Sequence, residues 1–193
     1  MLDSPLLFSC PIPHVPDLQK WLPADLLTAP LAPGQHDWLY EDKGSLTRRL
    51  SALADGAFSV TPLTEGWQTL REDECTALEV PAESHGWVRE VYLSGHEQPW
   101  VFARSVAARQ ALEQSGLDLP HLGSRSLGEL LFSDPAFHRS QLEARHYPSD
   151  WLPEAVRRPD LWARRSCFSQ GNLRVLVAEV FLPALWQAAR III

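Results

Sequence analysis

The sequence predicts an α+β protein, with helices packed on a single antiparallel sheet. Apolar stretches typical of strands occur in two pairs, and a short polar segment typical of a hairpin turn joins the members of each pair. Strands joined by hairpins form antiparallel sheets, whereas parallel strands need long crossovers. Amphipathic stretches typical of helices separate the two pairs. With 193 residues, of which 45% are hydrophobic, the chain is long enough to fold as one domain over residues 1–193.

An arm, a helix and a strand are predicted in the first third of the chain. Residues 1–35 are rich in proline and are expected to form an arm with short helical turns that wraps the domain. Ser45 is a suitable N-cap residue, and leucines follow it at helical spacing, which predicts a helix. Residues 58–63 predict the first strand.

The first predicted hairpin lies in the middle of the chain. Residues 87–93 and 100–106 alternate as strands do, and residues 94–99 between them have the composition of a hairpin loop. Ser126, followed three residues later by Glu129, forms a capping-box pattern before an apolar run. This pattern predicts the start of another helix.

The other stretches complete the predicted order of elements. Residues 106–114 predict a helix, and the polar residues 134–160, interrupted by prolines, predict a helix and a long loop. Residues 164–168 and 173–182 predict the second hairpin, with residues 169–172 as its turn.

Charge and composition exclude several classes of function. Seventeen Lys and Arg against 24 Asp and Glu give a formal net charge of -7, and this acidic balance argues against nucleic acid as a partner. The seven histidines show neither HxxxH nor HxH spacing, so no metal site is expected. Nucleotide-binding glycine motifs and a GxSxG motif are also absent, so any chemistry is expected to run without a cofactor.

Cysteine usage and hydropathy suggest the compartment. The three cysteines are far apart and form no CxxC pair, which favours a reducing cytosol over a disulfide scaffold. Cys167, in a predicted strand, lacks an evident base and is interpreted as a small core residue. The N-terminus has no signal-peptide pattern, and the longest apolar stretch, residues 175–186, contains a glutamate and a proline. We therefore expect a cytoplasmic protein without membrane insertion.

Two charged residues fall where the strand pattern requires apolar side chains. Arg89 shares its predicted strand face with a tryptophan, a valine and a leucine, and Glu179 shares its face with two valines and a phenylalanine. The opposite face of the last strand is nearly as apolar, so that strand is expected to be buried on both sides. Burying either charge is costly unless it is paired.

Three explanations remain open for these two residues. In the first, Arg89 and Glu179 form a structural ion pair in the core. In the second, both line a closed cavity, where the guanidinium binds a ligand carboxylate and a carboxyl group withdrawn from water transfers a proton. In the third, the alignment of a surface charge with an apolar face arises by chance.

Two predicted helix starts are a second candidate feature. Small residues surround Leu46 and Leu127, at positions where the first backbone N–H groups of a helix have no helical partner. Such N–H groups can donate hydrogen bonds to anions or phenolic oxygens at close range. Ordinary helix capping is the alternative explanation.

Several of these segments together resemble the chorismate pyruvate-lyase family of bacterial ubiquinone biosynthesis. The resemblance covers most of residues 38–183 in family order, and it lies in the segments WLYED, SLTRR, WVRE, PWVFARSV, SLGELLF, LWARRS and EVFLP. Any one of these segments is a weak signal, but the set in order is specific. The resemblance implies an antiparallel sheet with flanking helices and an internal ligand cavity.

The resemblance also implies the reaction and the site. The family converts chorismate to 4-hydroxybenzoate and pyruvate, the first committed step toward ubiquinone, without a cofactor. By position, Arg89 is expected to bind the ring carboxylate, Glu179 to act as general acid/base at the hydroxyl end, and the backbones at Leu46 and Leu127 to contact the ligand. The enolpyruvyl carboxylate needs its own donors, for which Arg104 and Arg165 are candidates.

Two further expectations accompany this assignment. Chorismate and 4-hydroxybenzoate are the expected small-molecule partners, and the protein is expected to be a monomer. The alternative function is a non-catalytic effector or sensor domain of the same fold, whose cavity only binds an aromatic carboxylate. Turnover of chorismate distinguishes the two.

Overall fold

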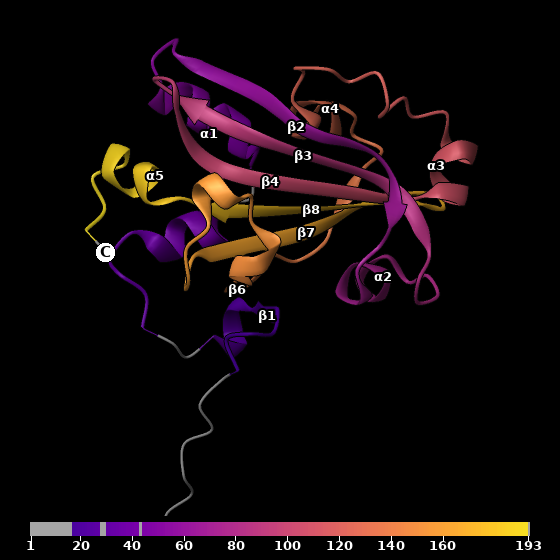
Figure 1. The fold of residues 1–193 in the computed structure, drawn as a ribbon, viewed down its shortest axis with the longest axis horizontal. Helices are drawn as coiled ribbons and strands as arrows, with labels where there is room; N and C mark the ends of the chain where they lie inside the picture. Colours follow the sequence, from indigo (N-terminus) through magenta and orange to yellow (C-terminus); the bar gives the residue numbers. More distant parts are fainter. Residues whose placement is uncertain (1–16, 28–29, 43, 193) are drawn as a thin grey trace, which may run out of the picture.

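The computed structural model describes residues 17–27, 30–42 and 44–192, and it has the predicted α+β architecture. Within these ranges, eight strands form one antiparallel sheet in the order β1-β6-β7-β8-β4-β3-β2, with β5 paired to β7 (Figure 1). The strands are β1 (Leu22–Pro23), β2 (Phe58–Thr69), β3 (His85–Gly95), β4 (Gln98–Ala108), β5 (His138–Arg139), β6 (Glu143–His146), β7 (Trp162–Gln170) and β8 (Leu173–Phe181). The α-helices are α1 (Leu46–Leu53), α2 (Glu72–Leu78), α3 (Arg109–Ser115), α4 (Leu127–Ser133) and α5 (Pro183–Ala188).

The centre of the sheet is buried on both faces. From Trp100 to Ala108 every residue of β4 is buried. Every residue of β8 is buried or half-buried, as the sequence predicts for this strand. Side chains of a strand alternate between faces, so each central strand supplies two layers of core. The candidate residues Arg89 and Glu179 lie on the same face, which is the face that α1 and α4 cover.

Both predicted hairpins are present. The strands β3 and β4 are joined by His96 and Glu97, whose φ angles of 50° and 65° match the tight two-residue turn that suits the twist of antiparallel strands. Gly95 lies just before the turn, where a Cβ atom would stand 2.2 Å from the ring of Trp100. The second hairpin turns at Gly171, which has a φ of 56°.

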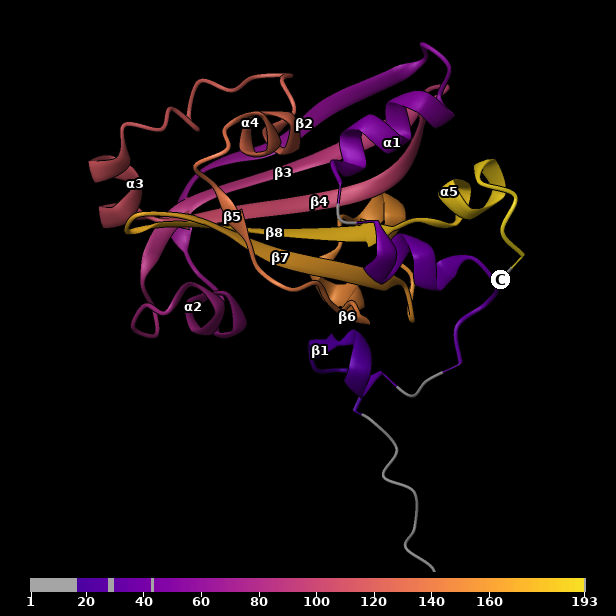
Figure 2. The same cartoon turned by 180° about the vertical axis from the view of Figure 1, so that it is seen from behind.

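Figure 2 shows α1 and α4 side by side on one face of the sheet, where α1 packs on β3. Each helix begins with the predicted serine cap: Ser45 accepts a hydrogen bond from the amide of Arg48 at 3.4 Å, and Ser126 accepts one from the amide of Glu129 at 3.2 Å. Both N-cap predictions are therefore confirmed, and the N-termini of the two helices meet above the same part of the sheet.

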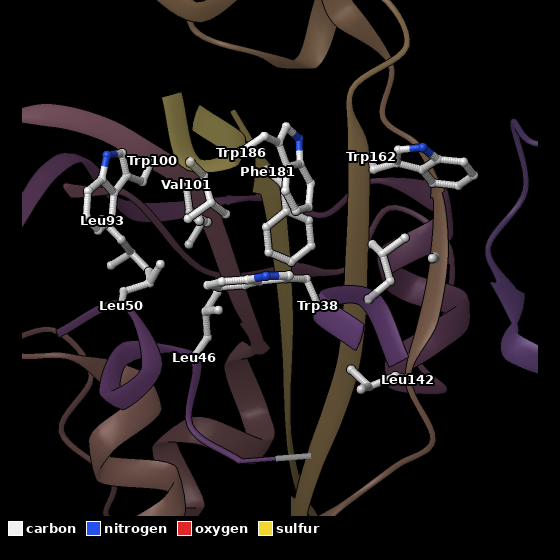
Figure 3. Packing of buried hydrophobic residues seen from close by; sticks show 14 of the residues in the cluster. Trp38, Leu46, Leu50, Leu93, Trp100, Val101, Leu142, Trp162, Phe181 and Trp186 are labelled. Atoms are coloured by element: carbon white, nitrogen blue, oxygen red, sulfur yellow. The ribbon is translucent and has the colours of Figure 1, made fainter. Parts of the chain in front are cut away.

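A tryptophan-rich cluster fixes the position of α1. Figure 3 shows the ring of Trp38 between Phe181 and Leu46, with Trp186 of α5 beside Phe181. The Trp38 ring meets Phe181 edge-on at 6.4 Å, and the guanidinium of Arg49 lies 3.5 Å from the centre of that ring. Because Phe181 belongs to β8 and Leu46 begins α1, this packing holds the start of the helix against the sheet.

Some predicted boundaries and elements are wrong. Residues 106–114 are not one helix, because β4 continues to Ala108 before α3 begins. Residues 134–160 contain no α-helix; they form β5, β6 and two short 3-10 turns, Ser149–Trp151 and Glu154–Val156. The first strand runs to Thr69 instead of ending at residue 63, and neither α2 nor α5 is anticipated by the sequence analysis.

The predicted N-terminal arm lies partly outside the described residues. In the described part, Leu22 and Pro23 form β1, which pairs with β6 at one edge of the sheet, and a short 3-10 turn follows over Ala24–Leu26. In the described ranges no helix is long and apolar enough to cross a membrane. Of the cysteines, Cys75 is buried and Cys167 half-buried, and both are free thiols; burial raises the pKa of the Cys167 thiol.

Candidate active site

All four residues singled out from the sequence line one cavity. Leu46, Arg89, Leu127 and Glu179 surround a space of about 40 Å³, enclosed between the sheet and the starts of α1 and α4. A cavity of this size has room for a water molecule. The other lining residues are Thr47, Val60, Val91, Leu93, Ala103, Ser105, Ser126, Gly128, Phe132, Arg139, Ser166, Phe168 and Val177.

The strand register sets where the two charged residues stand in this cavity. Arg89 on β3 lies opposite Ser105 on β4, whereas Glu179 on β8 lies opposite Ala103 of the same strand. One strand therefore separates them, and their positions differ by two residues along it. Strand geometry places them roughly 10 Å apart across the sheet and about 7 Å apart along it.

The structural ion pair between Arg89 and Glu179 that the sequence left open is wrong. Each residue has a different partner: Arg89 pairs with Glu65, and Glu179 pairs with Arg164. The alternative that both line a closed cavity agrees with the structure. The two residues stand at separate ends of the same enclosed space.

Arg89 is anchored at one end of the cavity by three acceptors. It is only 3% exposed, it pairs with Glu65 on β2, and its Nη2 donates to the carbonyl oxygens of Gly123 at 2.6 Å and Arg125 at 3.1 Å. A bulge in β2 after Pro62 shifts the register so that Glu65 lies opposite Arg89. The guanidinium is thus held in a fixed orientation by a carboxylate and two backbone carbonyls.

Glu179 at the other end is held by Arg164. The Nε of Arg164 donates to Oε2 of Glu179 at 2.6 Å, and its Nη1 donates to the carbonyl oxygens of Trp38 at 2.7 Å and Asp42 at 3.2 Å. Arg164 has no exposed surface, and among the described residues its Nη2 has no hydrogen-bond partner. A charge buried this deeply is tolerated because the carboxylate of Glu179 offsets it.

The two helix starts close the cavity. The hydroxyls of Thr47 on α1 and Ser126 at the cap of α4 lie 2.6 Å apart and are hydrogen-bonded. In both helices the serine cap binds the third amide of the first turn, which leaves the amides of Leu46 and Leu127 outside the helical hydrogen-bond ladder. Such amides are suited to bind an oxygen of a ligand in the cavity.

Neither arginine considered for the second carboxylate reaches the cavity. Arg104 and Arg165 project from the opposite face of the sheet, because each is one residue away from a position that lines the cavity, Ser105 and Ser166. Arg104 binds Glu74 and Glu90 there. Arg165 binds Glu143 and Asp73. These two candidates are therefore wrong.

Four residues that line the cavity or pair with its charged residues were not found from the sequence. The strand pattern that identified Arg89 applies equally to Arg164, which shares a face with Trp162 and Phe168, so alternation in β7 was the available signal. Glu65 was missed because Pro62 and the bulge that follows it interrupt the strand alternation. Arg139 and Thr47 line the cavity from a two-residue strand and a helix start, where no periodicity marks them.

The described part of the chain has no cluster of three or more His, Cys, Asp or Glu side chains that could hold a metal ion. The cavity instead offers two guanidinium groups, one carboxylate, four serine or threonine hydroxyls and two helix starts. These groups can bind a small anion, orient it and exchange a proton with it. Fold and site together define an α+β protein with an enclosed cavity that carries two cations and one carboxylate.

Comparison with known proteins places the chain within one family. The model of the chorismate lyase family matches residues 15–191, and the chain belongs to this family. A probable chorismate pyruvate-lyase of Pseudomonas aeruginosa (strain UCBPP-PA14) is 64% identical over 177 residues, which cover 92% of this chain and 98% of the relative. A probable chorismate pyruvate-lyase 2 of Pseudomonas fluorescens (strain Pf0-1) is 61% identical over 170 residues, 88% of this chain and 92% of the relative.

Solved structures share the fold at much lower identity. The effector domain of PhnF from Mycobacterium smegmatis aligns with a TM-score of 0.51 at 12% identity, covering 73% of this chain and 90% of that chain. A second structure, titled PhnF C-terminal domain, aligns with a TM-score of 0.51 at 13% identity, covering 68% of this chain and 87% of that chain. The antiparallel α+β architecture is thus shared with the effector domain of PhnF.

Proposed function

We propose that this protein is a chorismate pyruvate-lyase, which converts chorismate to 4-hydroxybenzoate and pyruvate. The observation that carries the proposal is the placement of Arg89 and Glu179 at separate ends of one enclosed cavity. A cation for the ring carboxylate and a carboxylate for proton transfer are two of the groups that this reaction needs. Membership of the chorismate lyase family supports the same assignment.

The ring carboxylate of the substrate binds Arg89. A carboxylate with two oxygens matches the planar donor face of a guanidinium, and it competes with Glu65 for that group. The backbone amides of Leu46 and Leu127, at the helix starts that cover the cavity, donate hydrogen bonds to oxygens of the ligand. With the ring carboxylate at Arg89, the far end of the ring extends toward Glu179.

At that end the reaction breaks the ether bond at C3 and removes the hydrogen from C4. The C4–H electron pair forms the third double bond of the ring, and the C–O pair leaves with the enolpyruvyl group. That group gains a proton on its methylene carbon and becomes pyruvate, so atoms and charge balance. Glu179 moves the proton, a role worth about 10²–10⁴-fold in rate, and the ring gains aromatic stabilisation.

The small volume of the cavity has a consequence for turnover. A benzoate ring with its substituents needs more room than about 40 Å³, so the starts of α1 and α4 must separate to admit a ligand. Closure over a bound ring then excludes water from the reaction. Opening of this cover to release 4-hydroxybenzoate is expected to limit the turnover rate.

In the cell, this activity is proposed to supply 4-hydroxybenzoate as the first committed step of ubiquinone biosynthesis in the cytoplasm. The protein is proposed to act as a monomer, with chorismate as its substrate and no cofactor. Each of these points stays a prediction that follows from the proposed reaction.

The test is incubation of the purified protein with chorismate in the presence of EDTA. Formation of 4-hydroxybenzoate, followed by its absorbance, and of an equal amount of pyruvate, followed with lactate dehydrogenase, is the expected result. Because the fold is shared with effector domains, the competing result is tight binding of 4-hydroxybenzoate without turnover. That result would replace the lyase with an aromatic-carboxylate sensor, and activity restored only by a metal would contradict the cofactor-independent reaction.

A further inference from the structure

Two cations, not one, line the cavity. Among the described residues that line it, Arg89 and Arg139 are the basic side chains and Glu179 is the acidic one. Chorismate carries two carboxylates, whereas 4-hydroxybenzoate carries one. The proposed function uses Arg89 for the ring carboxylate and leaves the enolpyruvyl carboxylate without a partner, since Arg104 and Arg165 lie on the other face of the sheet.

The strand order places Glu179 between the two cations. Arg89 belongs to β3 and Glu179 to β8, and Arg139 belongs to β5 on the far side of β7, where it pairs with Phe168. Across the sheet the charged side chains therefore follow the order Arg89, Glu179 and Arg139, which is a cation, a carboxylate and a second cation. In chorismate the ring carboxylate stands para to C4, and the enolpyruvyl group is attached next to C4, so the same order occurs in the substrate.

The side chain of Arg139 is held at the boundary of the cavity. Its Nε donates to Oγ of Ser166 at 2.8 Å, and its Nη1 donates to the carbonyl oxygen of Gly44 at 3.4 Å. The guanidinium also lies 5.2 Å from the ring centre of Phe132 and 5.4 Å from that of Phe168. These contacts orient a planar cation at the wall that the start of α1 shares with the sheet.

Beyond Arg139 lies an open groove. Arg139 lines both the cavity and this groove, which has a volume of about 530 Å³ and is also lined by Ala24, Tyr40, Glu41, Ser140, Gln141 and Leu142. The enclosed cavity has too little room for a three-carbon side chain beside the ring. The groove provides that room on the side where Glu179 acts.

Electrostatics agree with this position. Burial lowers the pKa of the Arg139 guanidinium, and the negative charge of Glu179 acts to raise it. The two side chains are therefore close enough to interact electrostatically. An arginine remains cationic at neutral pH in spite of such a shift. A carboxylate that enters between Glu179 and the groove therefore meets a positive charge.

Given the proposed lyase function, we propose that Arg139 binds the enolpyruvyl carboxylate of chorismate. Arg89 holds the ring and Arg139 holds the side chain that leaves, so the C3–O bond lies beside Glu179. Arg139 is then a residue that recognises substrate but has no contact with the carboxylate of the aromatic product. Pyruvate, still bound to Arg139 after the bond breaks, leaves through the groove.

The experiment compares Arg139→Gln with Arg48→Gln, which removes the same charge from the exposed side of α1. For Arg139→Gln we expect kcat/KM for chorismate to fall at least about 30-fold, the effect of removing one partner of a buried charge pair. The dissociation constant for 4-hydroxybenzoate, measured by calorimetry, should change by less than about threefold. Arg48→Gln should leave both quantities unchanged.

A structural role for Arg139 predicts a different pattern. If the residue only holds Ser166 and the start of α1 in place, substrate and product binding weaken together, and that result would overturn the proposal. An unchanged kcat/KM would overturn it as well. Arg139→Lys keeps the charge but loses the planar donor face, and it should recover at least about tenfold of the lost kcat/KM while binding 4-hydroxybenzoate normally.

Two outcomes keep this proposal separate from the proposed function. Wild-type protein that leaves chorismate intact would contradict the lyase assignment before any variant is compared. If the wild type turns over chorismate, and substitution of Arg89 but not of Arg139 abolishes this activity, the lyase assignment is retained and only the role of Arg139 is rejected. If Arg139→Gln does not fold, Arg139→Lys supplies the same test. The proposal requires that this variant has a lower kcat/KM for chorismate than the wild type and an unchanged affinity for 4-hydroxybenzoate.

Discussion

The Nε of Arg164 donates a 2.6 Å hydrogen bond to Oε2 of Glu179, its direct neighbour across β7 and β8. The same guanidinium binds the carbonyl oxygens of Trp38 and Asp42 in the segment that precedes α1. One buried cation therefore connects the proposed proton-transfer carboxylate with the element that covers the cavity. Because Oε2 is engaged by Arg164, Oε1 is the oxygen available for proton transfer.

Glu179→Gln tests the proton-transfer role. The amide has the shape of the carboxylate and can still accept a hydrogen bond from Arg164, but it cannot exchange a proton. We expect kcat to fall at least about 10²-fold while 4-hydroxybenzoate still binds. Turnover is measured with chorismate, and product binding by calorimetry.

The same substitution also removes the negative charge that offsets Arg164. Leaving a fully buried arginine without its counter-charge should lower the melting temperature, so stability and turnover have to be measured on the same samples. Glu79→Gln is the matched control, since it removes a glutamate from an exposed ion pair with Arg174. A folded Glu179→Gln protein that turns over chorismate at the wild-type rate would rule out proton transfer by Glu179.

Arg89→Ala is expected to abolish tight binding of 4-hydroxybenzoate. The ring carboxylate would lose its partner in an enclosed site, at a cost of roughly 3–5 kcal/mol. Calorimetry on the folded variant measures this loss directly. Near-native affinity would show that the ring carboxylate binds elsewhere in the cavity.

Glu65→Gln is expected to have the opposite effect on affinity. Glu65 pairs with Arg89, so a ligand carboxylate must compete with it for the same guanidinium. A neutral amide competes less strongly, and we therefore expect 4-hydroxybenzoate to bind several-fold more tightly and to dissociate more slowly. Weaker binding by this variant would indicate that Glu65 orients Arg89 for the ligand rather than competing with it.

Strand alternation predicted the face of each charged residue but not its partner. Alternation assigns each of Arg89 and Glu179 to the apolar face of its own strand, and in the sheet these faces coincide and line the cavity. A partner depends on strand order, because β4 lies between β3 and β8 and keeps the two residues apart. Strand order is a property of long-range pairing, which a local pattern does not contain.

Elements with weak periodicity were the ones missed. Within β2, Pro62 and Gly66 interrupt the alternation, and the strand lies at the edge of the sheet with one face largely exposed, so its second half carries no apolar signal. The helix α2 is seven residues long and begins with three acidic residues, which resemble a surface loop. Strands of two and four residues, such as β5 and β6, are too short for any period to be recognised.

Acid should weaken the fold through Glu74. Burial acts to raise the pKa of this carboxyl, but hydrogen bonds and charge from Arg104 outweigh burial, and the pKa is lower than its usual value. A lowered pKa in the folded state means that the stabilising contribution is complete above the unfolded pKa, about 4.3, and is lost as the pH falls through the folded value.

The lowered pKa of Glu74 predicts how the stability of a neutral variant depends on pH. The melting temperature of Glu74→Gln should lie below that of the wild type by a constant amount between about pH 7 and pH 5, and the gap should narrow below about pH 4. Thermal melts over this range measure the gap. A gap that stays constant at acidic pH would mean that the charge of Glu74 contributes nothing to stability.

The hydrogen bond between Thr47 and Ser126 is expected to set how long product stays bound. It joins the starts of α1 and α4 over the cavity at 2.6 Å, and no other hydrogen bond between these two helix starts occurs in the described ranges. Thr47→Val keeps the shape and removes the hydroxyl. A bond of this kind contributes about 0.5–1.5 kcal/mol, so 4-hydroxybenzoate should dissociate about two- to tenfold faster.

The effect on turnover depends on which step is slow. If opening of the helix starts limits turnover, faster release raises kcat of Thr47→Val by a similar factor, whereas the rate of a single turnover on pre-bound enzyme stays unchanged. Stopped-flow displacement of product and single-turnover assays measure the two rates separately. Thr76→Val, at an exposed helical position away from the cavity, controls for loss of a hydroxyl alone. Faster release without a rise in kcat would place the slow step in the chemistry at Glu179.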